Sequence, residues 1–313
     1  MLRRWSLVVV ACEAVIAFGC NGAGKEDPAT STSASAVAVS APVPQPPASA
    51  PVNATPLSAA SVAAYVNPRK LPAYNGPTGS IEGHVSIVGD PSPDAPAYDY
   101  RKCPQARETY AKLFREGAPD ATGARPLADA LVAVTGYEGF YLPEGNEVRA
   151  ITIDKCAFSA RTIDMTIGQR LDITNNTDLL VAPAFSQSPA PALMVAAPHR
   201  DAVRLYPQKP RYDTLIDRMS ASFLKADVYV LLFPLHTVTG LDGHYRIDGV
   251  PVGKMTVNAR LAPIQRETSK SVDVLANVVT TVDLQLAYKA KPDAGPPQVA
   301  AVDGGVSPQS LVK

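Results

Sequence analysis

Residues 235–261 read LHTVTGLDGHYRIDGVPVGKMTVNARL, and this stretch decides how the chain folds. Tyr245 and Ile247 alternate with polar residues, which is the period of a strand with one buried face. The pair Asp242–Gly243 before them is a favoured hairpin turn, because glycine tolerates a positive φ. A second reversal at 251–253 leads into a returning strand, in which apolar side chains again recur at every second position. The stretch therefore predicts two antiparallel strands joined by tight turns.

The same period of two recurs on both sides of this stretch. About nine short segments rich in Val, Ile, Thr or Tyr show it, within residues 81–87, 131–135, 148–154, 165–177, 227–233, 243–250, 254–261, 270–276 and 280–288. Most are bounded by Gly, Pro, Asn or Asp, and such spacing predicts an all-β fold of antiparallel sandwiches. One segment differs. From Pro104 to Glu116 the apolar side chains recur at helical spacing, so we expect one short helix there.

Residues 225–288 resemble the carboxypeptidase regulatory-like domain, a small transthyretin-like sandwich. That family shows Thr-Asp-x-x-Gly-x-Phe/Tyr, then an apolar-x-x-apolar-Pro-x-Gly run and a strand of alternating apolar residues. The matching positions here are Thr239, Gly243, Tyr245, Ile247, Val250, Pro251 and Gly253. Gly240 stands where the family usually has Asp. The resemblance implies a regulatory-type sandwich module and not the peptidase, whose zinc-ligand pattern does not occur in the sequence.

A stretch beginning at Cys156-Ala157-Phe158 resembles the cupredoxin pattern of plastocyanin-type proteins. There an apolar strand leads into Gly-x-x-apolar-x-apolar-x-Asn and then a copper-binding His. The matching positions are Gly168, Leu171, Ile173 and Asn175. No His follows in LLVAPAFSQS, and residues 219–233, where a second group of copper ligands would fall, contain neither Cys nor His. A type-1 copper site needs two imidazoles and a thiolate. The resemblance therefore implies a cupredoxin-like fold, and we expect no copper or other metal cofactor.

The two resemblances, the layout of the N-terminus and the Pro-rich composition near both ends divide the chain into five parts. We expect a signal peptide, a lipid-anchored tether rich in Pro, Ala and Ser, a cupredoxin-like sandwich, a carboxypeptidase regulatory-like sandwich and a disordered tail, at residues 1–19, 20–78, 79–224, 225–288 and 289–313, respectively. Two segments within 79–134, GSIEGHVSIVGD and PLADALVAV, resemble first strands of the same families. The sandwiches are therefore expected in tandem, either consecutive or interleaved, with early strands completing the later sandwich.

The N-terminus has the layout of a secretory signal peptide. Two arginines precede a mostly apolar stretch that ends in Ala17-Phe18-Gly19-Cys20, which resembles a bacterial lipobox. We expect Cys20 to carry lipid, although Phe18 departs from the small residue usual at its position. A plain signal peptide or an uncleaved anchor is the alternative. Asn21 is not the Asp that favours inner-membrane retention, which indicates the outer membrane, with the folded part in the periplasm or at the cell surface.

Cys103 and Cys156 are the cysteines of the part expected to fold. In an exported chain, two such cysteines predict one disulfide, which would close a loop of about fifty residues. Two separate buried thiols are the alternative. Because no Cys-x-x-Cys motif or Cys/His cluster occurs, zinc is not expected.

The sequence VRLYPQKPRYD at 203–213 is the strongest candidate for a ligand surface. Two tyrosines with three cations near them could stack on a sugar or bind an anionic polymer: Tyr206, Tyr212, Arg204, Lys209 and Arg211. An ordinary polar loop is the alternative.

The histidines are candidates of a second kind. His199 lies in a Pro-rich loop and His236 directly precedes a predicted strand, so either could contact a ligand. The alternatives are a solvated loop for His199 and a packed strand start for His236. His84 and His244 are expected to point to solvent from exposed strand faces.

Composition and motifs narrow the function. The chain has 29 Lys and Arg against 29 Asp and Glu, and this balance argues against a nucleic-acid binder. No motif places a carboxylate pair, a nucleophile with its base or a Gly-rich phosphate loop, so we expect no enzymatic activity. The sequence indicates a cell-envelope lipoprotein with a binding or structural role, held at the membrane by lipid and partnered by a glycan or an envelope protein. A periplasmic copper or electron-transfer protein and a carbohydrate-binding surface module are the alternatives.

Overall fold

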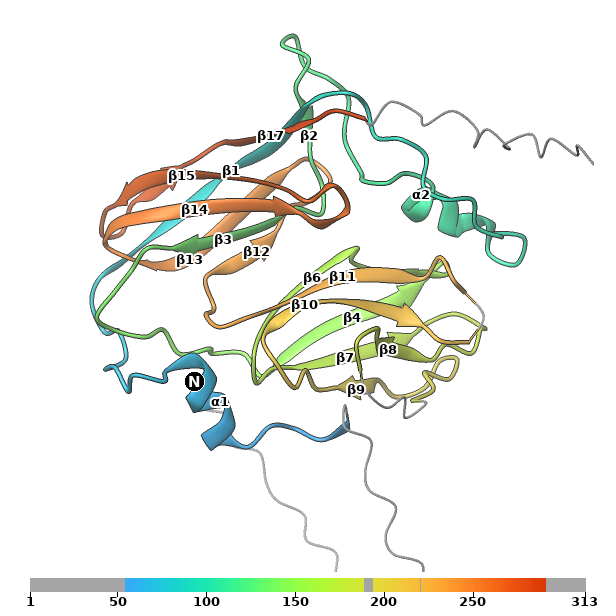
Figure 1. The fold of residues 1–313 in the computed structure, drawn as a ribbon, viewed down its shortest axis with the longest axis horizontal. Coiled ribbons are helices and arrows are strands. Elements are labelled where there is room, and N and C mark those ends of the chain that lie inside the picture. The colour runs from blue at the N-terminus through green and yellow to red at the C-terminus, as the bar shows by residue number, and fades with distance from the viewer. Residues whose placement is uncertain (1–53, 189–193, 220, 291–313) are drawn as a thin grey trace, which may run out of the picture. The chain divides into compact units, whose positions relative to one another are not determined.

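The computed structural model describes residues 54–188, 194–219 and 221–290. Within these residues the chain forms seventeen strands and two short α-helices. The strands fall into two groups, as Figure 1 shows. Each group has its own buried core. The all-β fold class predicted from the sequence is confirmed. The predictions for the signal peptide, for Cys20 and for residues 291–313 lie outside the described residues.

One group of strands, which we call the host sandwich, draws on both halves of the chain. Its strands are β1 (Thr78–Gly89), β2 (Arg125–Pro126), β3 (Leu131–Thr135), β12 (His236–Val238), β13 (His244–Pro251), β14 (Gly253–Leu261), β15 (Arg266–Val274), β16 (Val279–Thr281) and β17 (Leu284–Tyr288). In the first sheet, β1 pairs antiparallel with β13 and β2 and parallel with β16 and β17. The second sheet has the order β12-β3-β14-β15. Apolar side chains from both sheets form one continuous core.

The other group, which we call the inserted sandwich, is continuous in sequence. Its strands are β4 (Val148–Asp154), β5 (Ala157–Phe158), β6 (Thr162–Thr166), β7 (Arg170–Asn175), β8 (Pro183–Phe185), β9 (Val203–Leu205), β10 (Arg211–Asp217) and β11 (Lys225–Leu231). One sheet has the order β6-β11-β10-β8 and the other β5-β4-β7-β9. A second, separate core fills this sandwich.

The strand pairing departs from the two consecutive ranges expected at 79–224 and 225–288. β1 and β3 lie in the first range, but they pair with β13 and β14 of the second. β11 lies in the second range, but it pairs with β6 and β10 of the first. Of the two predicted arrangements, the interleaved one is therefore observed, with the inserted sandwich occupying the connection from β3 to β12. The reason is sheet completion, because β3 is the strand that joins β12 to β14.

Tight turns shape the host sandwich as residues 235–261 predict. Gly243 has φ +77°, and a Cβ there would lie 2.5 Å from the carbonyl oxygen of Val85, so only glycine fits this turn. Tyr245 and Ile247, which follow the turn, are both buried in the core of the host sandwich. The Tyr245 hydroxyl donates to the carbonyl oxygen of Val282 at 2.5 Å, which satisfies the polar end of a buried ring.

The helix expected from Pro104 to Glu116 is shorter than predicted. After a single 3-10 turn, α2 spans only Arg107–Tyr110, and no helix continues to Glu116. The reason lies in where the apolar side chains go. Tyr110 is buried in the core of the inserted sandwich, whereas Phe114 is buried in the core of the host sandwich. A continued helix would hold both side chains on one face, so the chain leaves the helix and ties the two cores together.

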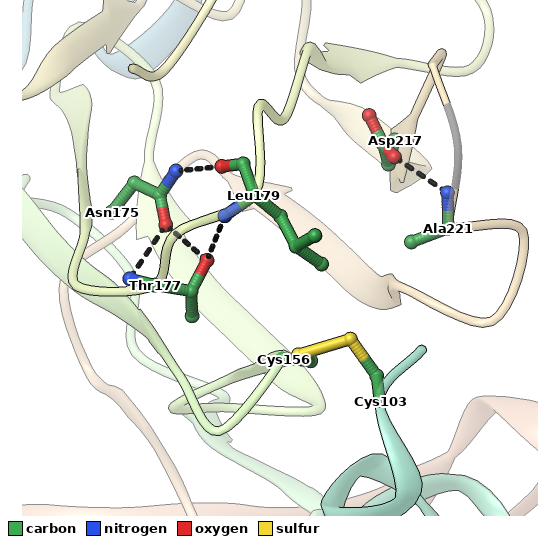
Figure 2. The surroundings of a disulfide bond; sticks show 7 residues. All are labelled: Cys103, Cys156, Asn175, Thr177, Leu179, Asp217 and Ala221. Atoms are coloured by element: carbon green, nitrogen blue, oxygen red, sulfur yellow. Dashed lines mark hydrogen bonds between the residues drawn. A yellow bond between two sulfur atoms is a disulfide. The ribbon is translucent and has the colours of Figure 1, made fainter. Parts of the chain in front are cut away.

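A disulfide fixes the start of this segment, and the predicted pairing is confirmed. Cys103 is bonded to Cys156, which lies in the turn between β4 and β5, with their Cα atoms 5.9 Å apart (Figure 2). Cys103 is 1% exposed and belongs to the core of the inserted sandwich. The bond therefore holds the segment before α2 against that sandwich.

The tether expected at 20–78 ends earlier, because residues from 54 onward are folded. Helix α1 spans Ala59–Val66, and the Ser58 hydroxyl caps it by accepting from the N–H of Ser61 at 3.1 Å. An N-cap serine followed by an Ala-rich run favours a helix. Tyr65 and Val66 also pack against the core of the inserted sandwich. No helix in the described ranges is long and apolar enough to cross a membrane.

Replacing both cysteines, Cys103→Ser with Cys156→Ser, should lower the free energy of unfolding by about 4 kcal/mol, which is the loop-entropy value for a separation of 53 residues. Urea unfolding of the full chain measures this loss. A reductant should destabilise the wild-type protein to a similar extent and leave the double variant unchanged. A wild-type urea midpoint that does not respond to reductant would contradict the pairing.

Candidate functional site

A groove of about 870 Å³ lies between α1 and the turn that joins β6 to β7. Four segments that are distant in sequence line it: α1 with its flanking residues, the connection from β3 to β4, the β6–β7 turn, and Tyr206 after β9. Its apolar lining includes Leu57, Val62, Val66, Leu71, Leu142 and Ile167. The volume lies within the range of about 300–1,000 Å³ that is typical of small-molecule sites.

The helix wall of the groove depends on one glycine. Gly168, in the β6–β7 turn, has φ +103°, and a Cβ there would lie 2.9 Å from Cγ1 of Val62 on α1. Any other side chain would strain the turn and push the helix away. The helix ends at Asn67, whose side chain bonds the N–H and the C=O of Leu71 at 2.7 and 2.8 Å. Both contacts fix the position of this wall.

The polar lining of the groove suits a ligand without net charge. Tyr141 and Tyr206 both line it, and neither hydroxyl is hydrogen-bonded to another described residue. Each ring therefore offers an apolar face and an uncommitted hydroxyl. The charged side chains of the lining balance one another: Lys70 and Arg170 against Glu144 and Glu147.

A chain of polar side chains, buried at its centre, connects the groove to the boundary between the two sandwiches. His236 of β12, in the host sandwich, lies 2.8 Å from Asp164 through Nδ1 and 3.1 Å from Thr166 through Nε2. Asp164 and Thr166 both belong to β6 of the inserted sandwich. Arg149 bonds the second oxygen of Asp164 at 2.6 Å, and Thr166 bonds Glu144 at 2.6 Å. We call these five residues the junction relay, and its last two members, Thr166 and Glu144, also line the groove.

Both ring nitrogens of His236 have partners in the junction relay. Nδ1 faces the Asp164 carboxylate, and Nε2 faces the Thr166 hydroxyl. That hydroxyl in turn donates to the Glu144 carboxylate. The relay therefore links the two sandwiches through hydrogen bonds on both sides of one ring.

Burial and charge act in opposite directions on Asp164. Its side chain is only 6% exposed, and burial raises its pKa, but the bond from His236 and the charge of Arg149 outweigh this effect. The pKa of Asp164 is consequently lowered from its ordinary value. The carboxylate stays ionised in the interior because it is paired on both of its oxygens.

The sequence of β6 explains why the junction relay can form, because polar and apolar residues alternate in a strand that is buried throughout. All five residues of this strand are buried, yet the polar residues Thr162, Asp164 and Thr166 occupy every second position. Ile163 and Met165 face the core of the inserted sandwich. The polar positions face the host sandwich instead, since the Thr162 hydroxyl donates to the carbonyl oxygen of Asp129 at 2.7 Å. A strand with polar residues on one face and both faces buried is the signal that could have revealed this junction.

The structure does not gather the predicted ligand-surface residues into one patch. Tyr206 lines the groove, while Arg204 is exposed on β9. Arg211 and Tyr212 belong to strand β10 rather than to a loop, and Tyr212 lines a separate pocket of about 290 Å³. Arg211 is paired with Asp213 at 2.6 Å. Of this set, Tyr206 alone is part of the groove lining.

The hydroxyl of Tyr212 is hydrogen-bonded to a carboxyl group. Its hydroxyl donates to Oδ1 of Asp227 at 2.6 Å. Burial, and then the negative charge of Asp227, raise the pKa of Tyr212 to about 12. Burial also raises the pKa of Asp227, and it outweighs the opposing bond from Tyr212. The pair is a satisfied contact between neighbouring strands.

The four histidines occupy different surroundings. His236 is buried in the junction relay, and its side chain is 7% exposed. His199 is exposed, and its Nε2 lies 3.2 Å from Asp178. His84 and His244 are exposed on strands β1 and β13. His199 and His236 share no contact, so they do not form a common site.

Asn175, the last residue of the cupredoxin-like sequence pattern, organises a turn. It ends β7 and is buried, and its Oδ1 accepts from the N–H and the hydroxyl of Thr177. Its amide donates to the carbonyl oxygen of Leu179, as Figure 2 shows. No group of three or more His, Cys, Asp or Glu side chains is gathered as a metal site in the part of the chain that the structure describes. Cys103 and Cys156, the two cysteines among the described residues, form the disulfide, so neither offers a free thiolate as a metal ligand.

Solved structures of amicyanin overlap part of the chain. A reduced single-residue mutant of amicyanin is 12% identical, with 28% of this chain and 86% of that chain covered and a TM-score of 0.25. Amicyanin from Paracoccus versutus is 14% identical, with 29% and 85% covered and a TM-score of 0.24. No family model matches the sequence, and no curated protein matches it. At TM-scores this low, the overlap establishes no function for this chain.

Replacing His236 with Ala should lower the free energy of unfolding by about 3 kcal/mol, because it leaves Asp164 and Thr166 buried without their partner. Chemical denaturation of the full chain measures this loss. His199→Ala is the matched control, since it removes an exposed histidine that also faces a carboxylate. The control should cost less than about 1 kcal/mol. Equal losses in the two variants would show that the relay adds nothing to stability.

Proposed function

We propose that this protein is an exported, lipid-anchored protein of the cell envelope that binds a neutral carbohydrate in the groove beside α1, without catalysing a reaction. The observation that carries the proposal is the groove itself, with its two uncommitted tyrosine hydroxyls and its balanced charges. A carbohydrate has apolar ring faces and many hydroxyls, which match tyrosine rings and polar side chains in one site. The absence of net charge on the lining favours this class over an anionic polymer.

The construction of the groove also supports a binding role. Val62 and Gly168 meet in close contact, and the Asn67 side chain fixes the chain after α1, so the wall is already in place without a ligand. A site that is formed in advance loses less free energy to ordering when the ligand binds. On the opposite side, Thr166 holds the Glu144 carboxylate by a bond of 2.6 Å. Glu144 is thereby aimed and can accept from a ligand hydroxyl with its remaining lone pairs.

The envelope location rests on the N-terminal sequence and on the disulfide. Residues 1–20 have the layout of a lipoprotein signal peptide ending at Cys20. The Cys103–Cys156 bond suits an oxidising compartment outside the cytoplasm. In this proposal the Pro-rich segment after Cys20 is the tether, and α1 is the first folded element that it reaches. The tether would hold the groove near the membrane and its glycans.

We further infer that the host sandwich is a carboxypeptidase regulatory-like module. The proposal is supported by the positive φ of Gly243 and by the burial of Tyr245 and Val250, three of the positions that carry the sequence resemblance. In this proposal the host sandwich is a scaffold, and it contributes His236 to the junction relay behind the groove.

Binding of the full chain to an array of neutral oligosaccharides of glucose, mannose and N-acetylglucosamine tests the proposal. Tyr206→Ala and Tyr141→Ala should each weaken binding about tenfold, because each removes one stacking surface. Tyr212→Ala is the matched control, since Tyr212 lines a different pocket, and it should bind like the wild-type protein. No binding to any member of the array, or an equal loss in the Tyr212 variant, would reject the groove as a carbohydrate site.

A further inference from the structure

A second pocket, of about 230 Å³, adjoins the groove beside α1, and we call it the aromatic extension. Five residues line both cavities: Val66, Asn67, Leu71, Tyr141 and Leu142. The volume of the aromatic extension is below the range of about 300–1,000 Å³ that is typical of small-molecule sites. Its size and its shared wall therefore make it a continuation of the groove and not a site of its own.

Both crossings of the chain between the two sandwiches line the aromatic extension. Residues within 137–142 belong to the connection from β3 to β4, by which the chain leaves the host sandwich. Leu232 and Phe233 belong to the connection from β11 to β12, by which it returns. The end of α1 lies beside the β3–β4 connection (Figure 1). Phe233 packs against the core of the host sandwich and Tyr65 against that of the inserted sandwich, so both cores support the pocket.

Aromatic rings dominate the lining of the aromatic extension. Tyr137 and Phe140 are stacked, with ring centroids 5.4 Å apart and an angle of 9° between their planes. Tyr74 supports Phe140 in turn, at a centroid distance of 4.4 Å. Both stacked rings are half-buried, and Leu232 is 44% exposed. Apolar surface that stays open to water and is gathered in one pocket is typical of a binding site.

Two tyrosine hydroxyls supply polar groups to the aromatic extension. Neither Tyr65 nor Tyr137 has its hydroxyl bonded to another described residue. Burial raises the pKa of Tyr137 to about 12, so its hydroxyl keeps its proton at neutral pH and can donate. Among the described residues that line the pocket, Arg69 alone is charged, and it is exposed. The lining thus combines ring faces with hydroxyls, as the groove does.

We propose that the ligand is a linear oligosaccharide long enough to fill the groove and the aromatic extension together, with a sugar ring in the extension contacting Tyr137 and Phe140. This inference rests on the proposed function, because it takes the groove as a carbohydrate site. It adds a second subsite and a minimum length for the ligand. Tyr141 lines both cavities and contacts the ligand where it passes from one to the other.

The wall that the two cavities share is fixed before a ligand binds. The Tyr141 N–H donates to the carbonyl oxygen of Pro72 at 3.0 Å, and its carbonyl oxygen accepts from the N–H of Tyr74 at 2.9 Å. The Asn67 side chain holds both backbone groups of Leu71. The groove and the aromatic extension therefore keep a constant relation. A ligand already held in the groove can reach the second subsite without losing its overall freedom of motion again, which favours the longer chain.

Calorimetric binding of the full chain to glucose, mannose and N-acetylglucosamine series, each from monosaccharide to hexasaccharide, tests the proposal. For the sugar that binds, the hexasaccharide should bind at least about tenfold more tightly than the disaccharide, because only the longer chain reaches the aromatic extension. Phe140→Ala should remove this gain and leave the disaccharide affinity unchanged. Tyr141→Ala should weaken both ligands, because Tyr141 lines both cavities. Tyr212→Ala is the matched control, since Tyr212 lines a different pocket, and it should keep both affinities.

The outcomes separate the two subsites. Equal affinities for the disaccharide and the hexasaccharide, or a gain with length that persists in Phe140→Ala, would overturn the second subsite and leave the groove as a carbohydrate site. No binding at any length would reject the groove and the aromatic extension together. Phe140→Leu keeps an apolar side chain but removes the ring, and it replaces the alanine variant if circular dichroism shows that Phe140→Ala misfolds.

Discussion

His236 bonds the inserted sandwich with both of its ring nitrogens, and the other features at the boundary depend on this contact. The ring comes from β12, the first strand after the chain returns to the host sandwich, and its partners Asp164 and Thr166 lie on β6. A buried carboxylate is costly unless its oxygens are paired. Both oxygens of Asp164 and both ring nitrogens of His236 have partners, so the two sandwiches are held in a defined register at this point. The same contacts also fix one wall of the groove, because Thr166 and Glu144 are members of the junction relay and line the groove.

A second tie acts at the segment around α2. The disulfide fixes Cys103 to the inserted sandwich, and Tyr110 is buried in the same core. Phe114 is buried in the core of the host sandwich. Separation of the two sandwiches would have to withdraw one of these rings and expose it to water, which costs about 1.5–3 kcal/mol for a fully buried side chain. The host and inserted sandwiches are thus linked twice, by polar contacts at His236 and by apolar contacts around α2.

Much of the fold could be predicted from the sequence, because strands and turns are local properties. Alternating residues revealed β1 and β13, and Asp242–Gly243 identified the turn between its flanking strands. The order in which strands pair is not local, so the sequence left consecutive and interleaved sandwiches open. The helix after Cys103 was predicted too long for the same reason. Its spacing is helical, but the destination of Phe114 is set by a core built from distant strands.

The candidate site was harder to predict than the fold. Tyr206 was identified as a ligand-surface residue and lies in the groove, but Tyr212 lies in a different pocket, although only five residues separate the two. Glu144 and Tyr141 come from a connection with no strand or helix pattern, so no periodicity singled them out. His236 is a candidate from the sequence, as a histidine before a predicted strand, but its bonding to Asp164 and Thr166, more than sixty residues earlier in the chain, could not be predicted.

The central claim is that the two sandwiches form a single folding unit through their shared boundary. Scanning calorimetry of the full chain at neutral pH tests it most directly. The account predicts one unfolding transition, with a calorimetric enthalpy equal to the van't Hoff enthalpy. Two resolved transitions, or a calorimetric enthalpy well above the van't Hoff value, would show that the host and inserted sandwiches unfold independently and would contradict the account.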